Sequence, residues 1–184
     1  MSLSCWLAYP DDLGADVTLP NHRRLRIRAL RRCEEGPIRE LYAHLSPRTR
    51  YMRFLSPMPT LPDSVVRLLV RVDYHRSLAL VAEARDEGDS AVIGLASFGA
   101  VDDRNVEVAL VVRDDWQQQR VGTELARRVI DAAESRGFHR FIATFRSENV
   151  AIRRLLAGVG DIVSAQVSGG ISELAFVRRQ ERVH

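Results

Sequence analysis

The sequence predicts an α+β fold in which helices flank a mixed, mostly antiparallel sheet of about seven strands. Three apolar runs of strand length follow one another with only turn-rich connections between them, which is typical of an antiparallel meander. Segments with the apolar spacing of amphipathic helices lie before and after this meander, not between all successive strands. This order favours a largely antiparallel sheet with inserted helices over an all-parallel sheet.

The length and the apolar content predict one ordinary domain. The chain has 184 residues, of which 46% are hydrophobic, and this is enough for a single core. Residues 1–21 contain Pro10, Gly14 and Pro20 and are predicted to form an N-terminal arm. We therefore expect a single domain over residues 22–184.

The first half of that domain is predicted to hold one strand and three helices. The strand covers about 24–31, where arginine and apolar side chains alternate. A helix follows, with apolar residues at helical spacing: Ile38, Leu41, Tyr42 and Leu45. The segment 47–60 is predicted to be a short helix and a loop, and the next helix begins near Pro62 or Asp63.

The second half begins with the meander, whose runs are "SLALVAEA", "AVIGLASFGA" and "VEVALVV". An amphipathic helix follows from Arg120, and its apolar residues are Val121, Leu125, Ala126, Val129, Ile130 and Ala133. We expect Gly137 to cap its end. A strand at 138–145, a helix at 149–157 and two weaker strands at 161–167 and 171–177 complete the pattern.

The charge of the chain does not indicate a nucleic-acid-binding protein. The formal net charge is only +3, and because the sequence contains no lysine, all 27 basic residues are arginine. The one dense cluster is "HRRLRIRALRR", where strand spacing puts Arg24, Arg26 and Arg28 on one face. We interpret this face as the solvated side of an edge strand and not as a stripe for nucleic acid.

The sequence predicts no metal site, no disulfide and no membrane-spanning segment. Cys5 and Cys33 lack metal-ligand spacing, and the five histidines are too scattered to form a ligand pair on one helix. No apolar run reaches the roughly 18 residues that span a bilayer, and "SLSCWLAYP" lacks the charged start of a secretory signal. We expect a cytoplasmic protein.

The junction "DDWQQQRVGTEL" is the most unusual local feature. The start of a helix presents unpaired N–H groups and a positive dipole end, which together suit a phosphate. Gly122 would let a phosphate approach the backbone, and Arg120 and Thr123 would add a charge and a hydroxyl. Taken alone, the glycine more often marks only a plain turn than a phosphate site.

The junction and its surroundings resemble the GNAT superfamily of N-acetyltransferases. The resemblance is carried by "VEVALVVRDDWQQQRVGTEL" and "SENVAIRRLLAGVG", and it covers about 20–178. The superfamily signature is Gln-x-x-Gly-x-Gly/Ala, and here Gln117, Arg120 and Gly122 stand in its three places. The segments "YPDDLGADVTLPNHRRLRIRAL", "LSPRTRYMRFL" and "VDYHRSLALVAEA" look like the acetyltransferase domain of bacterial Pat-type protein lysine acetyltransferases.

The resemblance implies a GNAT fold that uses acetyl-coenzyme A as co-substrate and no metal. The junction would hold the pyrophosphate, the backbone of Leu110 to Val112 would pair with the pantetheine arm, and the Val112 amide would polarise the thioester carbonyl. Asn149 matches an asparagine that contacts the coenzyme. The implied cofactor-binding residues are Leu110, Val111, Val112, Gln117, Gln118, Gln119, Arg120, Val121, Gly122, Thr123 and Asn149.

Two positions depart from the family pattern. Arg120 replaces the first glycine, which is harmless in helical backbone and obstructive if the position needs a positive φ. Leu156 stands where many relatives carry a tyrosine that protonates the departing thiolate. The departing thiolate must then take its proton from another group or from water, or it leaves without an acid. A thiol has a reference pKa of about 8.5, so its anion leaves readily.

Glu107 is the candidate general base, because a lysine ammonium must lose its proton before it attacks and this glutamate interrupts an apolar strand. It also matches the family's catalytic glutamate, and in a partly dry cleft a carboxylate is a stronger base than in water. The alternative is a plain surface glutamate, and Glu83 is the next candidate. Tyr51, Arg53 and Phe54 fall where the family forms its acceptor wall, but we favour the interpretation that the aromatics belong to the core and the arginines are solvated.

The resemblance leaves the acceptor amine open. A protein lysine, for instance on a coenzyme A ligase, is the first expectation, and a small amine is the enzymatic rival. A non-catalytic domain that senses acyl-coenzyme A is the alternative from another class. We expect no nucleic-acid or membrane partner, and either a monomer or a homodimer that pairs its final strands.

Overall fold

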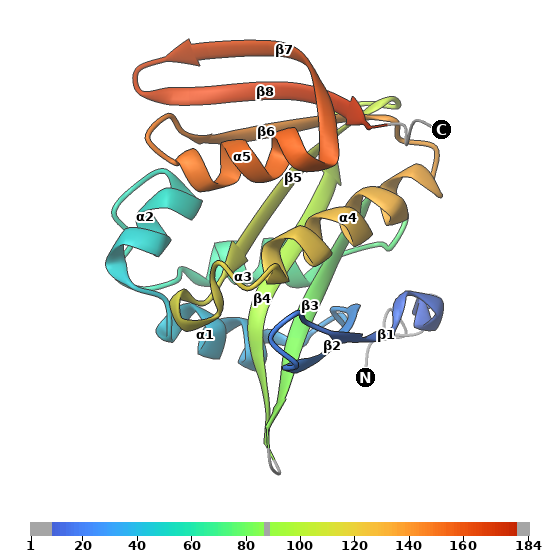
Figure 1. Cartoon of the computed structure of the whole chain (residues 1–184), viewed down its shortest axis with the longest axis vertical. Helices are drawn as coiled ribbons and strands as arrows, with labels where there is room; N and C mark the ends of the chain where they lie inside the picture. Colours follow the sequence, from blue (N-terminus) through green and yellow to red (C-terminus); the bar gives the residue numbers. More distant parts are fainter. Residues whose placement is uncertain (1–8, 87–88, 180–184) are drawn as a thin grey trace.

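The computed structural model of the chain describes residues 9–86 and 89–179 (Figure 1). Its sheet has eight strands in the order β1-β2-β3-β4-β5-β6-β8-β7. The strands are β1 Ala15–Thr18, β2 Arg24–Ala29, β3 Ser77–Asp86, β4 Asp89–Ala100, β5 Asn105–Val112, β6 Arg140–Arg146, β7 Gly160–Ser168 and β8 Ile171–Arg178. The helices are α1 Glu35–Ala43, α2 Pro47–Phe54, α3 Asp63–Val70, α4 Val121–Glu134 and α5 Val150–Val159, with short 3-10 turns at Asp11–Leu13 and Asp114–Trp116.

The predicted α+β fold is confirmed, including the antiparallel meander of β3, β4 and β5. Every neighbouring pair of strands is antiparallel except β5 and β6, which are parallel. That parallel pairing covers only Asn105–Glu107 against Arg140–Ile142. Beyond Glu107 the two strands diverge, and the sheet opens into a gap (Figure 1).

The helices cover the sheet around this gap. α4 packs on β3, β4 and β5, and α5 packs against α4 and β7, while α2 contacts β5 and β6 (Figure 1). The apolar residues expected for α4 are buried, and Leu125 reaches the sheet at Gly94, where a Cβ would lie 2.8 Å from its Cδ1. The close approach of α4 to the sheet therefore depends on a residue without a side chain.

The end of α4 confirms the expected role of Gly137. α4 ends at Glu134, and beyond it the Phe138 N–H donates to Ala133 O at 3.1 Å while the Gly137 N–H donates to Glu134 O at 2.9 Å. These two bonds define a Schellman motif, which needs a left-handed residue, and Gly137 has φ 90°.

The sheet has one strand more than expected. Residues 15–18, within the segment predicted as an arm, form β1 and pair antiparallel with β2. Because β1 covers it, β2 is not an edge strand, so this part of the prediction was wrong. Nor is its arginine face simply solvated, since the Arg28 side chain is only 14% exposed and pairs with Glu34 and Glu83.

None of the described helices is both long enough and apolar enough to cross a membrane.

Candidate active site

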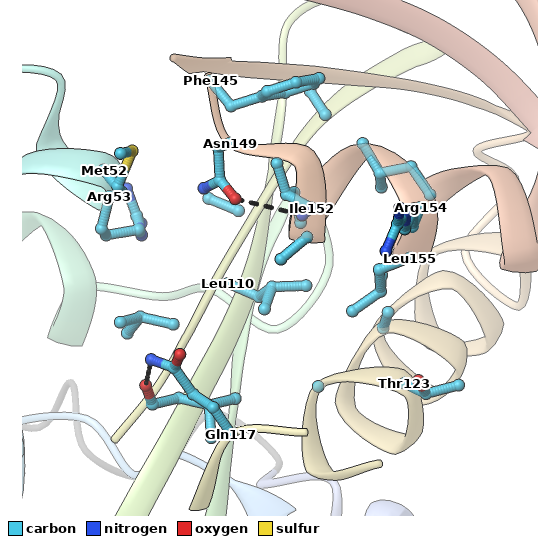
Figure 2. Close-up of a pocket in the computed structure, with 18 of the residues that line it drawn as sticks. Met52, Arg53, Leu110, Gln117, Thr123, Phe145, Asn149, Ile152, Arg154 and Leu155 are labelled. Carbon is cyan, nitrogen blue, oxygen red and sulfur yellow. Dashed lines mark hydrogen bonds between the residues drawn. The ribbon is translucent and has the colours of Figure 1, made fainter. Parts of the chain in front are cut away.

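A cavity of about 780 Å³ occupies the gap between β5 and β6 (Figure 2). Its walls come from α2, the second half of β5, the loop 113–120, the first turns of α4 and α5, and the end of β6. The volume is within the usual range for a site that holds one small organic ligand. Of the residues implied by the resemblance, those that line it are Leu110, Val111, Val112, Gln117, Gln118, Arg120, Gly122, Thr123 and Asn149.

The backbone of β5 presents free hydrogen-bonding groups to this cavity. The Arg113 N–H donates to Ile93 O at 2.8 Å, which makes this pair one of the hydrogen-bonded pairs of the antiparallel ladder. Because such pairs alternate along the strands, the N–H and C=O groups of Leu110 and Val112 point away from β4. They face the gap from which β6 has diverged, so an extended ligand can pair with them as an added strand would.

Gln117 fixes the end of this strand edge. Its Nε2 donates to Val112 O at 3.0 Å and lies 3.3 Å from Thr49 Oγ1 (Figure 2). The side-chain amide thus satisfies the Val112 carbonyl, and it leaves the Val112 N–H directed into the gap. An N–H held in this way is suited to polarise a carbonyl oxygen of a ligand.

The loop between β5 and α4 closes the other end of the cavity. Gln118 and Arg120 both have left-handed backbone, with φ 59° and 68°, and α4 begins directly afterwards at Val121. No side chain caps this helix start, so the N–H groups of its first turn remain available for an anion. A Cβ on Gly122 would lie 3.1 Å from Leu155 Cδ1, which shows how closely α4 and α5 approach here.

Arg120 has left-handed backbone, which is the case expected to be obstructive for a residue other than glycine. The chain nevertheless adopts this conformation with arginine, and Arg120 lines the cavity. A side chain other than glycine costs about 1 kcal/mol in this conformation. After allowance for the greater freedom of glycine in the unfolded chain, we expect Arg120→Gly to raise Tm by roughly 1–3 °C.

Thermal unfolding of Arg120→Gly beside Arg127→Gly checks this expectation. Arg127 is exposed in the middle of α4, where glycine costs about 1 kcal/mol, so the second variant should have a lower Tm than the wild type. Equal losses of Tm in both variants would show that the Arg120 conformation stores no strain.

Long-range contacts that the sequence did not reveal hold the loop in place. The Asp114 carboxylate accepts from the Ser46 N–H at 2.9 Å, from Ser46 Oγ at 2.7 Å and from Thr49 Oγ1 at 2.7 Å. Ser46 is also the N-cap of α2. Its place before Pro47 is a recognisable start signal, but no local pattern indicates a partner 68 residues away.

The N-terminal side of β2 supports the same loop. Trp116 is buried, and the Arg23 guanidinium lies 3.1 Å from the centre of its ring. Gln119 Oε1 accepts from Asn21 Nδ2 at 2.8 Å and from Arg23 NH1 at 3.3 Å. Gln119 therefore anchors the loop from outside, and Val121 is buried in the core, so neither side chain lines the cavity.

The Asp114 contacts predict a dependence of stability on acid. Burial alone would raise the pKa of Asp114, but hydrogen bonds from Ser46 and Thr49 outweigh this and hold the pKa below its usual range. Because the folded-state pKa is lowered, the stabilisation is present above the unfolded pKa of about 3.9 and is lost as the pH falls through the folded-state value.

We therefore expect Asp114→Asn to lower the free energy of unfolding at neutral pH by about 1 kcal/mol, a small value because the side chain is exposed and screened. The loss should shrink below about pH 4. Urea unfolding across pH measures it, with Asp103→Asn as control because the Asp103 side chain is 93% exposed. A loss that does not change with pH would contradict the assignment.

Glu107 lies at the point where β5 and β6 part, paired with Ile142 of β6 and Gly99 of β4. Leu110 and Val112 face α4, since a Cβ on Gly122 would meet both at 3.7 Å. Strand alternation therefore directs Glu107 to the opposite face. Its side chain is exposed and does not line the described cavity, so the expected partly dry surroundings are not found.

Three other residues singled out in the sequence lie in different places relative to the cavity. Glu83 accepts from Arg28 Nε at 3.0 Å, and it is absent from the cavity wall. Asn149 caps α5, with Oδ1 accepting from the Ile152 N–H at 3.2 Å (Figure 2). Leu156 lines the cavity and is buried, so its place offers an apolar surface where a tyrosine hydroxyl would stand in many relatives.

The three side chains considered for the acceptor wall have different surroundings. Phe54 packs on Tyr42, and the Arg146 guanidinium lies over the ring of Tyr51. Arg53 lines the cavity.

Within residues 9–86 and 89–179, no three histidine, cysteine, aspartate or glutamate side chains are arranged to hold a metal ion. Cys5 and His184 lie outside the described residues.

Comparison with known proteins adds to this geometry. A family model described as an acetyltransferase (GNAT) domain matches residues 24–160. An acetyltransferase of Pseudomonas aeruginosa is 29% identical over 144 residues, which cover 78% of this chain and 77% of the relative.

Two solved structures share the fold. The GNAT domain of PAT from S. lividans superimposes with a TM-score of 0.80 at 23% identity, covering 92% of this chain and 99% of that one. The yncA protein of Salmonella typhimurium, solved with its cofactor acetyl-CoA, gives a TM-score of 0.65 at 21% identity, covering 87% and 96%.

Proposed function

The chain belongs to the GNAT acetyltransferase family, and on that premise we propose that its cavity binds acetyl-coenzyme A and that the acetyl group passes directly to the lysine side chain of a protein, with Glu107 as general base. The observation that carries the proposal is the divergence of β5 from β6. It leaves the backbone groups of Leu110 and Val112 facing a cavity that ends at the open N-terminus of α4.

The two ends of the cavity suit the two halves of the coenzyme. The strand edge at Leu110 and Val112 offers alternating donors and acceptors to the amides of a pantetheine arm. The first turn of α4 offers N–H groups and a positive dipole end to a pyrophosphate, and Arg120 and Thr123 add a charge and a hydroxyl beside it. Asn149 stands at the α5 side of the same space.

The reaction needs little more than positioning from this chain. The Val112 N–H stabilises the negative charge that develops on the thioester oxygen as the amine attacks. Leu156 offers no proton, so the sulfur leaves as thiolate or takes a proton from water, which a reference pKa of about 8.5 permits. The amine must arrive without its proton, and removing that proton is the task we assign to Glu107.

Glu107 is supported as the base by the face of β5 that it occupies, and not by its distance from Val112. It lies about five residues along β5 from Val112, or about 16 Å, so a water chain or a long amine side chain must connect the two points. It also faces away from α4, on the side where α2 borders the cavity and an acceptor can approach without meeting the coenzyme. Its exposure means that solvent can carry the proton away.

A protein lysine as acceptor is supported by the Pat-like segments of the sequence and by the exposed approach beside α2. A coenzyme A ligase remains the first candidate protein. The chain has no lysine, so it cannot acetylate itself on lysine side chains. A signal on acetyl-lysine blots therefore reports a separate substrate protein.

We expect the purified protein to transfer labelled acetyl groups to lysines of a coenzyme A ligase with a kcat/KM at least about 10-fold higher than for spermidine or free amino acids. One hydrogen bond to a charged group of the acceptor supplies a difference of this size. Release of coenzyme A thiol measures both reactions. Faster turnover of the small amines would favour the small-amine enzyme, and binding without any turnover would favour an acyl-coenzyme A sensor.

A further inference from the structure

Arg53 of α2 is a cation at the cavity wall that the fold itself does not use. Its Nε is buried and donates to no residue that the structure describes, and the guanidinium forms no ion pair with any of them. The ring of Phe54 lies 5.0 Å from the guanidinium. Burying part of a charged group without a partner is costly, so such a group indicates a ligand that completes it.

Arg128 and Arg146 also have a buried Nε without a hydrogen-bond partner among the described residues, but neither of them lines the cavity. Three other arginines have structural partners. Arg28 joins Glu34 and Glu83, and Arg136 donates to the carbonyls of Tyr74 and Ala132. On α2 itself, Arg50 donates to Ala43 O at 3.1 Å and to Pro59 O at 2.9 Å. Arg53 therefore differs from Arg50 on the same helix in that no atom of its guanidinium donates to a described residue, and it differs from Arg128 and Arg146 in that it lines the cavity.

The position of Arg53 points to the acceptor and not to the phosphates of the coenzyme. Thr49, one turn earlier on α2, contacts Gln117 at the Val112 end of β5, while the Arg53 guanidinium is electrostatically coupled to Glu107 at the other end. Burial lowers the pKa of Arg53, and the negative charge of Glu107 offsets part of this effect. Figure 2 shows Arg53 across the cavity from Thr123, which lies in the first turn of α4.

We propose that Arg53 binds a carboxylate of the acceptor, so that the enzyme prefers an amine with an acidic group beside it. The source of the carboxylate is an aspartate or glutamate next to the target lysine in a protein, or the carboxylate of a free amino acid. The inference rests on the proposed function, because it assumes that the amine approaches Glu107 from the α2 side. The planar guanidinium pairs with a carboxylate through two parallel N–H···O bonds.

The test compares acceptors that differ only in charge. Peptides with one lysine flanked by aspartate, by asparagine or by arginine supply the protein-like pair, and free lysine with lysinamide supplies the small-amine pair. We expect the aspartate peptide to exceed the asparagine peptide by about 10- to 100-fold in kcat/KM, the usual worth of a hydrogen-bonded charge pair. A preference seen only between the peptides would assign the carboxylate to a residue beside the target lysine in a protein. A preference seen only between lysine and lysinamide would assign it to a free amino acid.

Variants of Arg53 assign the preference to this residue. Arg53→Gln should bring the aspartate and asparagine peptides to nearly equal kcat/KM, and Arg53→Glu should favour the arginine peptide. Arg67→Gln, an exposed change on α3 with the same loss of charge, should keep the wild-type ratio. The increase of Tm with acetyl-coenzyme A should match the wild type in all three variants, which shows that they are folded.

The outcomes separate this inference from the proposed function. Equal rates for the charged and neutral acceptors in the wild type, or a ratio that Arg53→Gln leaves unchanged, would overturn the role of Arg53 while acetyl transfer stands. Absence of acetyl transfer to every amine would overturn the proposed function and the inference with it.

Discussion

Replacing Glu107 by glutamine should lower kcat by about 10²- to 10⁴-fold, the usual contribution of a positioned general base. Glutamine keeps the shape of the side chain and removes its basicity. Affinity for acetyl-coenzyme A should barely change, because the groups that we assign to the coenzyme are the backbone of Leu110 and Val112 and the start of α4. Steady-state kinetics and a binding titration measure the two quantities separately.

The pH dependence of the same variant is a second readout. A lysine amine has a reference pKa of about 10.4, so Glu107→Gln should regain activity only at alkaline pH, where the amine loses its proton without help. Glu83→Gln is the matched control. Glu83 pairs with the partly buried Arg28, so this change should reduce stability and leave kcat close to the wild-type value. Near-normal turnover of Glu107→Gln at neutral pH would show that the base lies elsewhere or that solvent serves.

Replacing Gly122 by glutamate should abolish measurable binding of acetyl-coenzyme A. The change adds a negative charge to the first turn of α4, where the unpaired N–H groups face the cavity, and its Cβ lies 3.1 Å from Leu155 Cδ1. In the wild type, a ligand at 100 times its Kd stabilises the fold by about 2.7 kcal/mol and raises Tm, and the variant should show no such rise.

Two glycine variants control for side effects. Gly158→Glu places the same charge on α5, where a Cβ has no neighbour within 4 Å, and should keep the full increase of Tm. Gly122→Ala adds only the Cβ, which meets the flexible end of Leu155, and should weaken binding partially. An undiminished increase of Tm in Gly122→Glu would place the pyrophosphate away from α4.

Local patterns predicted most of the fold because each element carries its own periodicity. The alternating run at Asn105–Val112 and the four-residue spacing of α4 both appear in the structure as expected. β1 was missed because Ala15–Thr18 is only four residues long and lies among prolines and a glycine, where turn signals dominate. The cap at Gly137 was found because a Schellman motif depends on one residue type.

The site was less accessible to sequence reasoning, because it depends on contacts between distant segments. The bonds from Ser46 and Thr49 to Asp114 span more than sixty residues and leave no periodic trace. The left-handed backbone at Arg120 is also invisible, since arginine carries no preference for it. The exposure of Glu107 depends on where β6 leaves β5, which the pattern of either strand alone does not determine.

We propose that acetyl-coenzyme A lies along β5 with its pyrophosphate at the start of α4. Two-dimensional NMR of the backbone amides during a titration with acetyl-coenzyme A tests this placement. We expect saturable shifts that are largest at Leu110, Val112, Gly122 and Thr123, and small shifts on β7 and α3. The absence of saturable shifts, or shifts gathered away from β5 and α4, would contradict it.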